Sequence, residues 1–364
     1  MKTKHFTLLI VLVMIFHLRA DAQNSVNEIV EEAISFSSNE ATYNGTLSKP
    51  AGEGAFPLVI LVSGMGLQDR EWDFGAGKFK FAKIITDYLN QSGIAVYRYD
   101  DRGYGKSTGI PETLTSFYDL AEDVYAAAAM LNERKDIGKV GVLGHSLGGI
   151  LSIIAASKHP DIDFIITLSG SYKSGGEIMM EQAISLKRWK TADEMTDKQV
   201  IETGQQFVRN WVSHSNGYDG LDTVKQILSD LLHYQIRSMS PELLAKNLEI
   251  YKDTTDFFQQ EFEATLAYFT SPHQQSFAIY DPTEDFKKIT CPVLILFGEK
   301  DEHVITETNM PKVAQALESA SVTDLTIRII PEADHAYTTE ALFAKGEVVP
   351  GLLDFIANWI SFRK

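Results

Sequence analysis

A serine between two glycines, in the pentapeptide Gly144–Gly148 (GHSLG), is the feature of this sequence that most directly suggests chemistry. The apolar run 139–143 before it predicts a short buried strand, and the apolar, alanine-containing run 149–157 after it predicts a buried helix. A serine on such a sharp strand-to-helix turn projects its hydroxyl above the sheet, and the flanking glycines let the two backbones approach closely. Pattern and context together predict that Ser146 is a nucleophile.

A serine hydroxyl becomes a good nucleophile only when a base removes its proton, and that base must itself be oriented. Two later apolar runs, 291–297 and 325–330, predict strands. Asp301 lies just past the first of them and His335 just past the second. Because loops on one edge of a parallel sheet can converge, we expect Ser146, Asp301 and His335 to form a triad in which Asp301 orients the imidazole.

Neighbouring residues compete for the roles of acid and base. The alternative acids are three carboxylates of the same two loops: Glu299, Glu302 and Asp334. Asp301 is favoured because it lies on a short turn that leads to the apolar Val304. His303 is the rival base, but it lies on the same loop as Asp301 and would need a different acid to orient it. His145 is expected to project away from the serine hydroxyl, to pack, and to form a hydrogen bond nearby.

The tetrahedral intermediate of acyl transfer needs two preorganised hydrogen-bond donors for its oxyanion. One is the backbone N–H of Leu147, which directly follows the nucleophile. The other is expected from the glycine-containing loop 63–66, after the apolar run 56–62. Within that loop the N–H of Met65 is our choice, with the N–H of Gly64 as the alternative.

The elements that must position these residues alternate along the chain. Strands are predicted as a hairpin over about 28–48 and at 56–62, 94–99, 139–143, 164–168, 291–297 and 325–330. Helices are predicted at 80–92, 116–134, after Ser146, near 310–318 and at about 350–362. Uniformly apolar strands that alternate with helices are typical of an α/β fold with a mostly parallel sheet covered on both faces.

This alternation stops between about 172 and 288, where helix-like periodicity, many charges and scattered aromatic residues replace it. We predict that residues 172–288 form a helical lid inserted between a first core part, 23–171, and a second, 289–364. Open parallel sheets bind ligands at the carboxyl ends of their strands, so an insertion there is well placed to shape a substrate pocket. Some of its aromatic side chains would line the pocket, although most are expected to hold the insertion together.

Residues 1–22 have the pattern of an export signal. Lys2 and Lys4 precede the apolar run 6–18, and the small residues Ala20 and Ala22 supply a cleavage site. At about 13 residues the apolar run is too short to span a bilayer comfortably, so no stable membrane anchor is expected, with an uncleaved anchor as the alternative. The sequence predicts cleavage after Ala22 and a periplasmic or extracellular protein.

Composition and the remaining motifs limit the partners and cofactors. The net charge of −16 disfavours nucleic acid and anionic membrane surfaces. The single cysteine, Cys291, allows no intramolecular disulfide and is expected to be a small buried residue. Segment 103–107 (GYGKS) resembles part of a phosphate-binding loop, but Asp100 stands where that pattern needs glycine, so we expect a structural loop in which Arg102 pairs with a carboxylate. No metal-ligand spacing occurs, and neither a metal nor another cofactor is expected.

Five segments together resemble the α/β-hydrolase superfamily: 62–70 (VSGMGLQDR), 99–107 (YDDRGYGKS), 144–149 (GHSLGG), 298–301 (GEKD) and 334–335 (DH). Within it the chain is similar to bacterial serine hydrolases grouped near bile-acid–CoA thioesterases, dienelactone hydrolases and serine aminopeptidases. The resemblance covers about residues 50–170 and 288–362. It implies an eight-stranded, mostly parallel sheet and a cofactor-free acyl-enzyme mechanism, with Ser146 as nucleophile, Asp301 as acid and His335 as base.

The sequence therefore predicts an exported serine hydrolase that cleaves carboxylic esters of a small-molecule acyl substrate. A serine aminopeptidase or an acyl thioesterase with the same triad is the alternative. A non-catalytic binding protein on the same fold is disfavoured because the serine, aspartate and histidine are all present. The acyl length, the leaving group and the oligomeric state depend on how segment 172–288 packs, which periodicity does not indicate.

Overall fold

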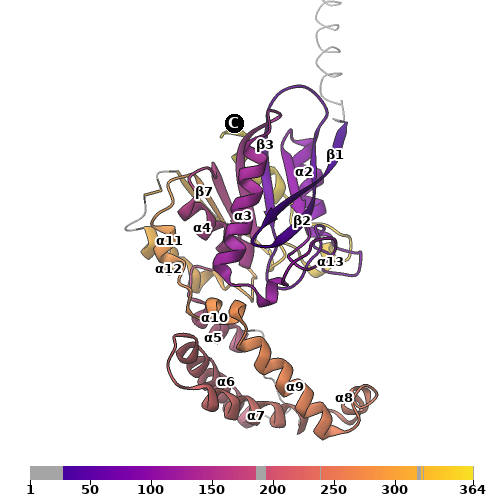
Figure 1. Cartoon of the computed structure of the whole chain (residues 1–364), viewed down its shortest axis with the longest axis vertical. Helices are drawn as coiled ribbons and strands as arrows, with labels where there is room; N and C mark the ends of the chain where they lie inside the picture. The colour runs from indigo at the N-terminus through magenta and orange to yellow at the C-terminus, as the bar shows by residue number, and fades with distance from the viewer. Residues whose placement is uncertain (1–27, 186–193, 238, 318–320, 323, 364) are drawn as a thin grey trace, which may run out of the picture.

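The structure, a computed structural model, describes residues 28–185, 194–237, 239–317, 321–322 and 324–363. The predicted signal peptide, residues 1–22, lies outside the described residues. A sheet core fills the upper part of Figure 1, and a layer of helices lies below it.

Eight strands form one sheet in the spatial order β1-β2-β4-β3-β5-β6-β7-β8. They are β1 (Ile29–Ser38), β2 (Ala41–Pro50), β3 (Phe56–Val62), β4 (Ala95–Tyr99), β5 (Ile137–His145), β6 (Phe164–Leu168), β7 (Val293–Gly298) and β8 (Leu325–Ile330). β2 pairs antiparallel with β1 and with β4, and the other neighbouring strands pair in parallel. The predicted α/β fold with an eight-stranded, mostly parallel sheet is confirmed.

The first two strands form the expected hairpin, and its turn is set by two residues with positive φ. Asn39 has a φ of 45° and Glu40 a φ of 63°. Two-residue hairpin turns of this kind need positive φ at both positions, because only then does the turn match the twist of the strands.

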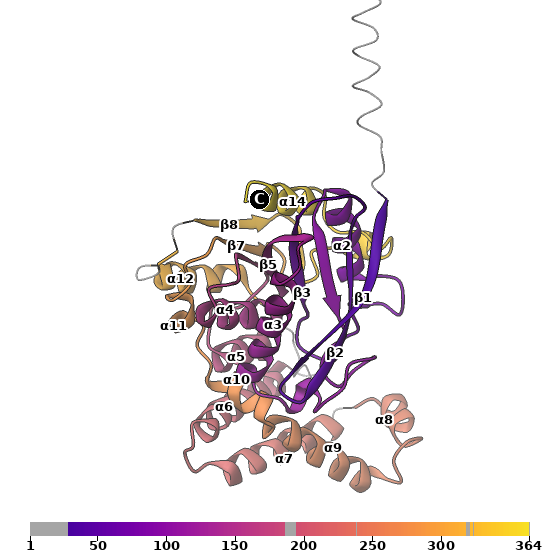
Figure 2. The ribbon, with the colours of Figure 1, turned by 45° about the horizontal axis from the view of Figure 1, so that its top comes forward.

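Helices cover both faces of the sheet, which explains why the central strands β3, β6 and β7 are apolar without alternation. Along β3, Leu58, Ile60 and Val62 pack into one core, whereas Val59 and Leu61 pack into the other. The first core contains α3 (Phe117–Asn132), α4 (Leu147–Lys158), α11 (Thr283–Phe286) and α12 (Thr306–Leu317). The second contains α2 (Phe81–Gln91) and α14 (Leu352–Ser361), seen near the top of Figure 2. The 3-10 turn η1 (Glu112–Leu114) and α13 (Glu340–Phe343) lie in connecting loops.

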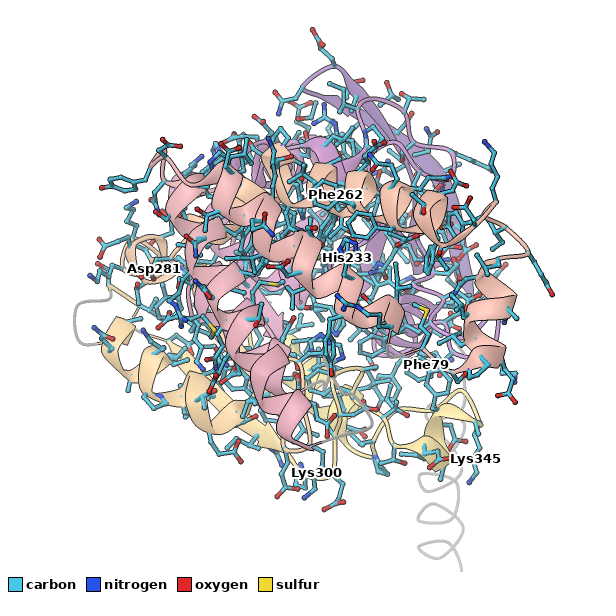
Figure 3. All side chains as sticks on the ribbon, turned by 90° about the horizontal axis from the view of Figure 1, so that it is seen from below. Phe79, His233, Phe262, Asp281, Lys300 and Lys345 are labelled. Atoms are coloured by element: carbon cyan, nitrogen blue, oxygen red, sulfur yellow. The ribbon has the colours of Figure 1, made fainter. Side chains whose placement is uncertain are left out.

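Between β6 and β7 the described chain is helical. The helices before α11 are α5 (Gly175–Ser185), α6 (Glu194–Ser215), α7 (Leu221–Arg237), α8 (Pro241–Asn247), α9 (Thr254–Phe269) and α10 (Pro272–Ile279). Figure 3 views the molecule from this side, with α7, which carries His233, beside α9, which carries Phe262. Below, these helices are called the helical segment.

Aromatic residues hold much of the helical segment together. The ring of Phe269 lies edge-on to Phe207, with ring centres 4.7 Å apart, and to Trp211, with ring centres 5.3 Å apart. The indole N–H of Trp211 also donates to the carbonyl oxygen of Phe269 at 2.9 Å. α6 and α9 are therefore joined by a buried aromatic cluster.

Candidate active site

Ser146 lies on a strained turn between β5 and α4. Its backbone has φ 54° and ψ −116°, a conformation that residues other than glycine rarely adopt, and its N–H donates to the carbonyl oxygen of Leu168 at 2.8 Å. A Cβ atom added at Gly144 would lie 2.0 Å from the carbonyl oxygen of Gly148, and one added at Gly148 would lie 2.2 Å from that of Val62. Only glycine fits at these two positions, which accounts for the spacing of the motif.

Asp301 and His335 are in direct contact. Nδ1 of His335 lies 2.8 Å from one carboxylate oxygen of Asp301 and 3.0 Å from the other. The Asp301 side chain is fully buried and also accepts the backbone N–H groups of His303 and Val304. Burial alone would raise the pKa of Asp301, but the imidazole of His335 and these hydrogen bonds hold the pKa below its usual range. The carboxylate is thus ionised. Because it contacts Nδ1 of His335, Nε2 is the ring nitrogen that can act as a base.

The competing acids have other contacts or positions. The carboxylate of Glu299 accepts the N–H of Glu332 at 2.9 Å, and that of Asp334 accepts the N–H groups of Ala336 and Thr338 at 3.0 and 2.9 Å. Glu299 therefore joins the loop after β7 to the loop after β8, and Asp334 braces its own loop. Glu302 is exposed at the rim of the pocket described below.

His303, the rival base, stacks on His335. The two rings have centres 4.6 Å apart and planes inclined by 23°. The carbonyl oxygen of His303 accepts the side-chain amide of Gln182 at 3.0 Å, which links this loop to α5. The structure therefore places His303 as a neighbour of the ring that contacts Asp301.

His145 joins the serine turn to the loop of His335. Its Nε2 lies 2.8 Å from the carbonyl oxygen of His335, and its ring is surrounded by Trp72, Phe74 and Phe81. Burial, together with the nearby imidazole of His335, lowers the pKa of His145 to about 3. The ring is therefore neutral at ordinary pH, and its Nε2–H donates to the carbonyl. The sequence predicts packing and a nearby hydrogen bond for His145, but it does not identify the carbonyl oxygen of His335 as the partner.

The loop after β3 runs beside the serine. A Cβ atom added at Gly64 would lie 3.2 Å from Cβ of Ser146 and 3.3 Å from Nδ1 of His145. The main chain of Gly64 and Met65 thus passes next to the serine on one side, and Leu147 begins α4 on the other. Backbone N–H groups at the start of a helix carry partial positive charge, which favours a developing anion there.

Ser146 and His335 open into one pocket of about 630 Å³. Its apolar wall comes from α4 and from the helical segment: Leu147, Ile150, Ile178, Met179, Tyr268, Phe269 and Phe277. Gln182, Lys300 and Glu302 line a more polar part. Tyr268 and Phe269 are among the aromatic residues of segment 172–288, some of which the sequence predicts to line a pocket. Ile178 and Met179 carry no sequence signal, because aliphatic residues at helical spacing are equally typical of a core.

The two remaining motifs are structural. Arg102 pairs with Asp123 at 3.1 Å, and both side chains are buried, while the N–H of Lys106 donates to the carboxylate of Asp100. Segment 103–107 is thus a hydrogen-bonded loop. Cys291 is half-buried rather than fully buried, because it lies just outside β7, and burial raises the pKa of its thiol to about 11.

The chain is similar to known hydrolases. The model of the serine aminopeptidase family S33 matches residues 77–250, and that of the dienelactone hydrolase family matches residues 254–343. Esterase EstD from Thermotoga maritima is 26% identical over 336 residues, which span 90% of this chain and 68% of that protein. Two hydrolase family models and one named esterase therefore match most of this chain.

Solved structures show the same fold. The α/β hydrolase GrgF from a Penicillium species superposes with a TM-score of 0.54 at 14% identity, covering 92% of this chain and 98% of that one. The 2,6-dihydroxy-pseudo-oxynicotine hydrolase superposes with a TM-score of 0.50 at 15% identity, covering 90% of this chain and 66% of that one. Taken with these folds, the two family models and the relative EstD place the chain in the α/β-hydrolase superfamily, and it is a hydrolase.

Two further observations concern membranes and metals. In the described part of the chain, no helix combines the length and apolar content that crossing a membrane requires. Among the same residues, no three His, Cys, Asp or Glu side chains are grouped so as to hold a metal ion.

Proposed function

We propose that the protein cleaves carboxylic esters through an acyl-enzyme on Ser146, with His335 as general base and Asp301 as the acid that orients it. The observation that carries this proposal is that a serine on a strained turn and a histidine bound to a buried carboxylate share one pocket. The strained turn presents the hydroxyl, and Asp301 fixes the tautomer in which Nε2 of His335 accepts a proton.

Each step follows from these positions. The Ser146 hydroxyl oxygen attacks the acyl carbonyl carbon while Nε2 of His335 takes the hydroxyl proton. The carbonyl oxygen becomes an oxyanion, which the N–H groups of Leu147 and Met65 stabilise, with Gly64 as the alternative to Met65. The intermediate then expels the alcohol, which receives the proton from His335. Finally His335 activates a water molecule that hydrolyses the acyl-enzyme and restores the serine.

Esters are favoured over peptides by the character of the pocket. The helical segment contributes aliphatic and aromatic side chains, which suit an apolar acyl group. An aminopeptidase needs a carboxylate for the substrate amine. Among the described residues two acids line the pocket: Asp334 already accepts two backbone N–H groups, and Glu302 is exposed at the rim. The name of the relative EstD also supports an esterase, whereas the match to the serine aminopeptidase family keeps a peptidase as the second candidate.

A fluorophosphonate probe tests the proposed nucleophile. We expect the wild-type protein to be labelled and Ser146→Ala, with unchanged circular dichroism, to be unlabelled. Folded wild-type protein that resists the probe would contradict the proposal. Hydrolysis of short and long p-nitrophenyl esters, acyl thioesters and aminoacyl p-nitroanilides then separates the candidate reactions. Turnover of the anilides alone would replace the esterase by an aminopeptidase.

We also propose that the helical segment is a lid over the pocket and that the protein is exported. The lid is supported by the pocket residues on α5, α9 and α10, and export by the signal-like pattern of residues 1–22. Expression of the full chain in a Gram-negative host, followed by mass spectrometry of the periplasmic fraction, tests export. We expect a mature N-terminus at Gln23, and retention of an intact Met1 in the cytoplasm would oppose it.

A further inference from the structure

Two buried carboxyl groups lie behind the loop that faces Ser146, outside the proposed triad. Asp101 is 4% exposed, and its two oxygens accept the hydroxyl of Ser63 and the N–H of Gln68, each at 2.6 Å. Glu112, on the turn η1, is 5% exposed, and its carboxyl group lies beside the N–H of Gly66. All three donors belong to residues 63–68, here called the oxyanion loop.

The oxyanion loop depends on these contacts for its position. Its outer side chains, Met65 and Leu67, are 39% and 38% exposed, so apolar burial fixes them only in part. Gly66 has a φ of 101°, and Gly64 approaches Ser146 so closely that an added Cβ would lie 3.2 Å from the serine Cβ. A small shift of this loop therefore changes the distance between its N–H groups and the atoms bonded to Ser146.

The helical segment contacts both the region around η1 and the oxyanion loop. The imidazole of His273 on α10 lies against the main-chain carbonyls of Glu112 and Thr115, at the start of η1 and just after it, and Ser276 accepts the N–H of Phe117 at 3.0 Å. The Met65 sulfur accepts hydrogen bonds from Tyr268 at 3.6 Å and from Gln274 at 3.9 Å. The turn that carries Glu112 and the loop that it holds are thus both in contact with the proposed lid.

The two carboxyl groups also share an environment that favours protonation. Burial raises the pKa of Asp101, and Asp100 and Asp69 add to this, although the donors from Ser63 and Gln68 oppose it. Burial and the neighbouring Asp101 raise the pKa of Glu112. Glutamine is therefore a close substitute for Glu112, because it keeps the length and the acceptor oxygen.

We propose that Glu112 and Asp101 are positioning residues, which hold the oxyanion loop at the distance from Ser146 that the reaction needs. This inference rests on the proposed function. Because the carboxyl groups act through the backbone of the loop, their loss lowers the stabilisation of the oxyanion and leaves binding of the uncharged ester largely unchanged. We therefore expect kcat to fall and KM to change little.

Two substitutions at Glu112 separate the length of its side chain from the presence of its carboxyl group. Glu112→Gln keeps the reach to Gly66 and removes the carboxyl group, whereas Glu112→Asp keeps the carboxyl group and withdraws it by one methylene. Positioning predicts a kcat within about 3-fold of wild type for Glu112→Gln and at least roughly 10-fold lower for Glu112→Asp, since loss of a whole oxyanion donor costs about 10²- to 10³-fold. KM should change little in either variant. Active-enzyme concentration is set by the end point of fluorophosphonate labelling.

Asn90→Ala is the matched control, which tests whether a loss of stability by itself lowers kcat. Asn90 is also buried, and its amide holds the carbonyl oxygens of Ser48 and Ile94 on another part of the sheet. We expect it to lower Tm without changing kcat. This inference alone is overturned if the wild-type enzyme is active but Glu112→Gln and Glu112→Asp have equal kcat. A lower kcat in Glu112→Gln than in Glu112→Asp would overturn it as well. Wild-type protein that is neither labelled nor active overturns the proposed function, and this inference with it.

Discussion

Nε2 of His145 lies 2.8 Å from the main-chain carbonyl oxygen of His335, a contact between residues 190 positions apart. The residue before the serine thus holds the loop that carries the proposed base. Since the His145 ring is buried among aromatic residues and stays neutral, its N–H is a fixed donor. Alignment of the two proposed catalytic groups therefore depends on a side chain that takes no part in the chemistry.

The contact between Asp301 and His335 predicts a large effect of Asp301→Asn. The amide presents the wrong partner to Nδ1 and favours the unproductive tautomer, so kcat should fall roughly 10³- to 10⁴-fold. Fluorophosphonate labelling of Ser146 should slow but still go to completion. Steady-state hydrolysis of a p-nitrophenyl ester measures the effect. Glu299→Gln, in the same loop, is the control and should stay within about 3-fold of wild type; the reverse ranking would make Glu299 the acid.

The close approach of the oxyanion loop predicts that Gly64→Ala lowers activity while the protein stays folded. The added methyl group would lie 3.2 Å from Cβ of Ser146 and 3.3 Å from Nδ1 of His145, so the loop must move by a few tenths of an ångström. We expect kcat to fall roughly 10-fold or more, because donor placement controls oxyanion stabilisation. Gly138→Ala is the control, since its methyl group would make ordinary contacts at 3.5 Å. Equal kcat in both variants would show that the loop tolerates the shift.

The pocket wall formed by α5 predicts a change in acyl-chain preference for Met179→Trp. Met179 lines the pocket that contains Ser146, whereas the next residue, Met180, lines a separate cavity on the other side of the helix. A tryptophan at 179 fills part of the pocket, so kcat/KM for long acyl esters should fall at least about 10-fold relative to short ones. Met180→Trp should leave this ratio unchanged. An unchanged ratio in both variants would place the acyl group elsewhere.

The buried His273 predicts that acid weakens the fold. Burial lowers the pKa of His273 to about 4, from an ordinary value of about 6.5, against its hydrogen bonds to the carbonyls of Thr115 and Glu112. Between these two pH values the unfolded chain binds the extra proton and the folded chain does not, so the free energy of unfolding falls as pH falls from about 6.5 to about 4. His273→Gln should lose less stability over this window, as measured by urea denaturation. Parallel curves would show that His273 does not titrate on unfolding.

Much of the sheet can be predicted from sequence because its central strands are buried on both faces. Continuous apolar runs with clear ends predict the central strands β3 and β6, and also the edge strand β8, at the bounds that the structure has. Helix starts are less predictable. The helix predicted near 310–318 is α12, which begins earlier, at Thr306, and contains Pro311. α11 and α13 have four residues each, too few to show a helical period.

The residues of the candidate site are likewise only partly predictable from the sequence. The order of strands is enough to place Asp301 and His335 in neighbouring loops, since a carboxyl end is defined by where an apolar run stops. Choosing Asp301 over Glu299 is a question of side-chain direction, for which the sequence offers only local composition. Glu112 has no signal at all, because it lies in an irregular loop and its burial results from long-range packing against α10.

The order of the strands along the chain also has a consequence for synthesis. The turn with Ser146 is translated with β5, whereas Asp301 and His335 follow β7 and β8, after the whole helical segment. Because chains emerge from the ribosome N-terminus first, a nascent or truncated chain that ends before β7 has the serine without its proposed base and acid. Such fragments lack the groups that would activate the serine, so the cell that makes this hydrolase is not exposed to its activity until the last two strands have joined the sheet.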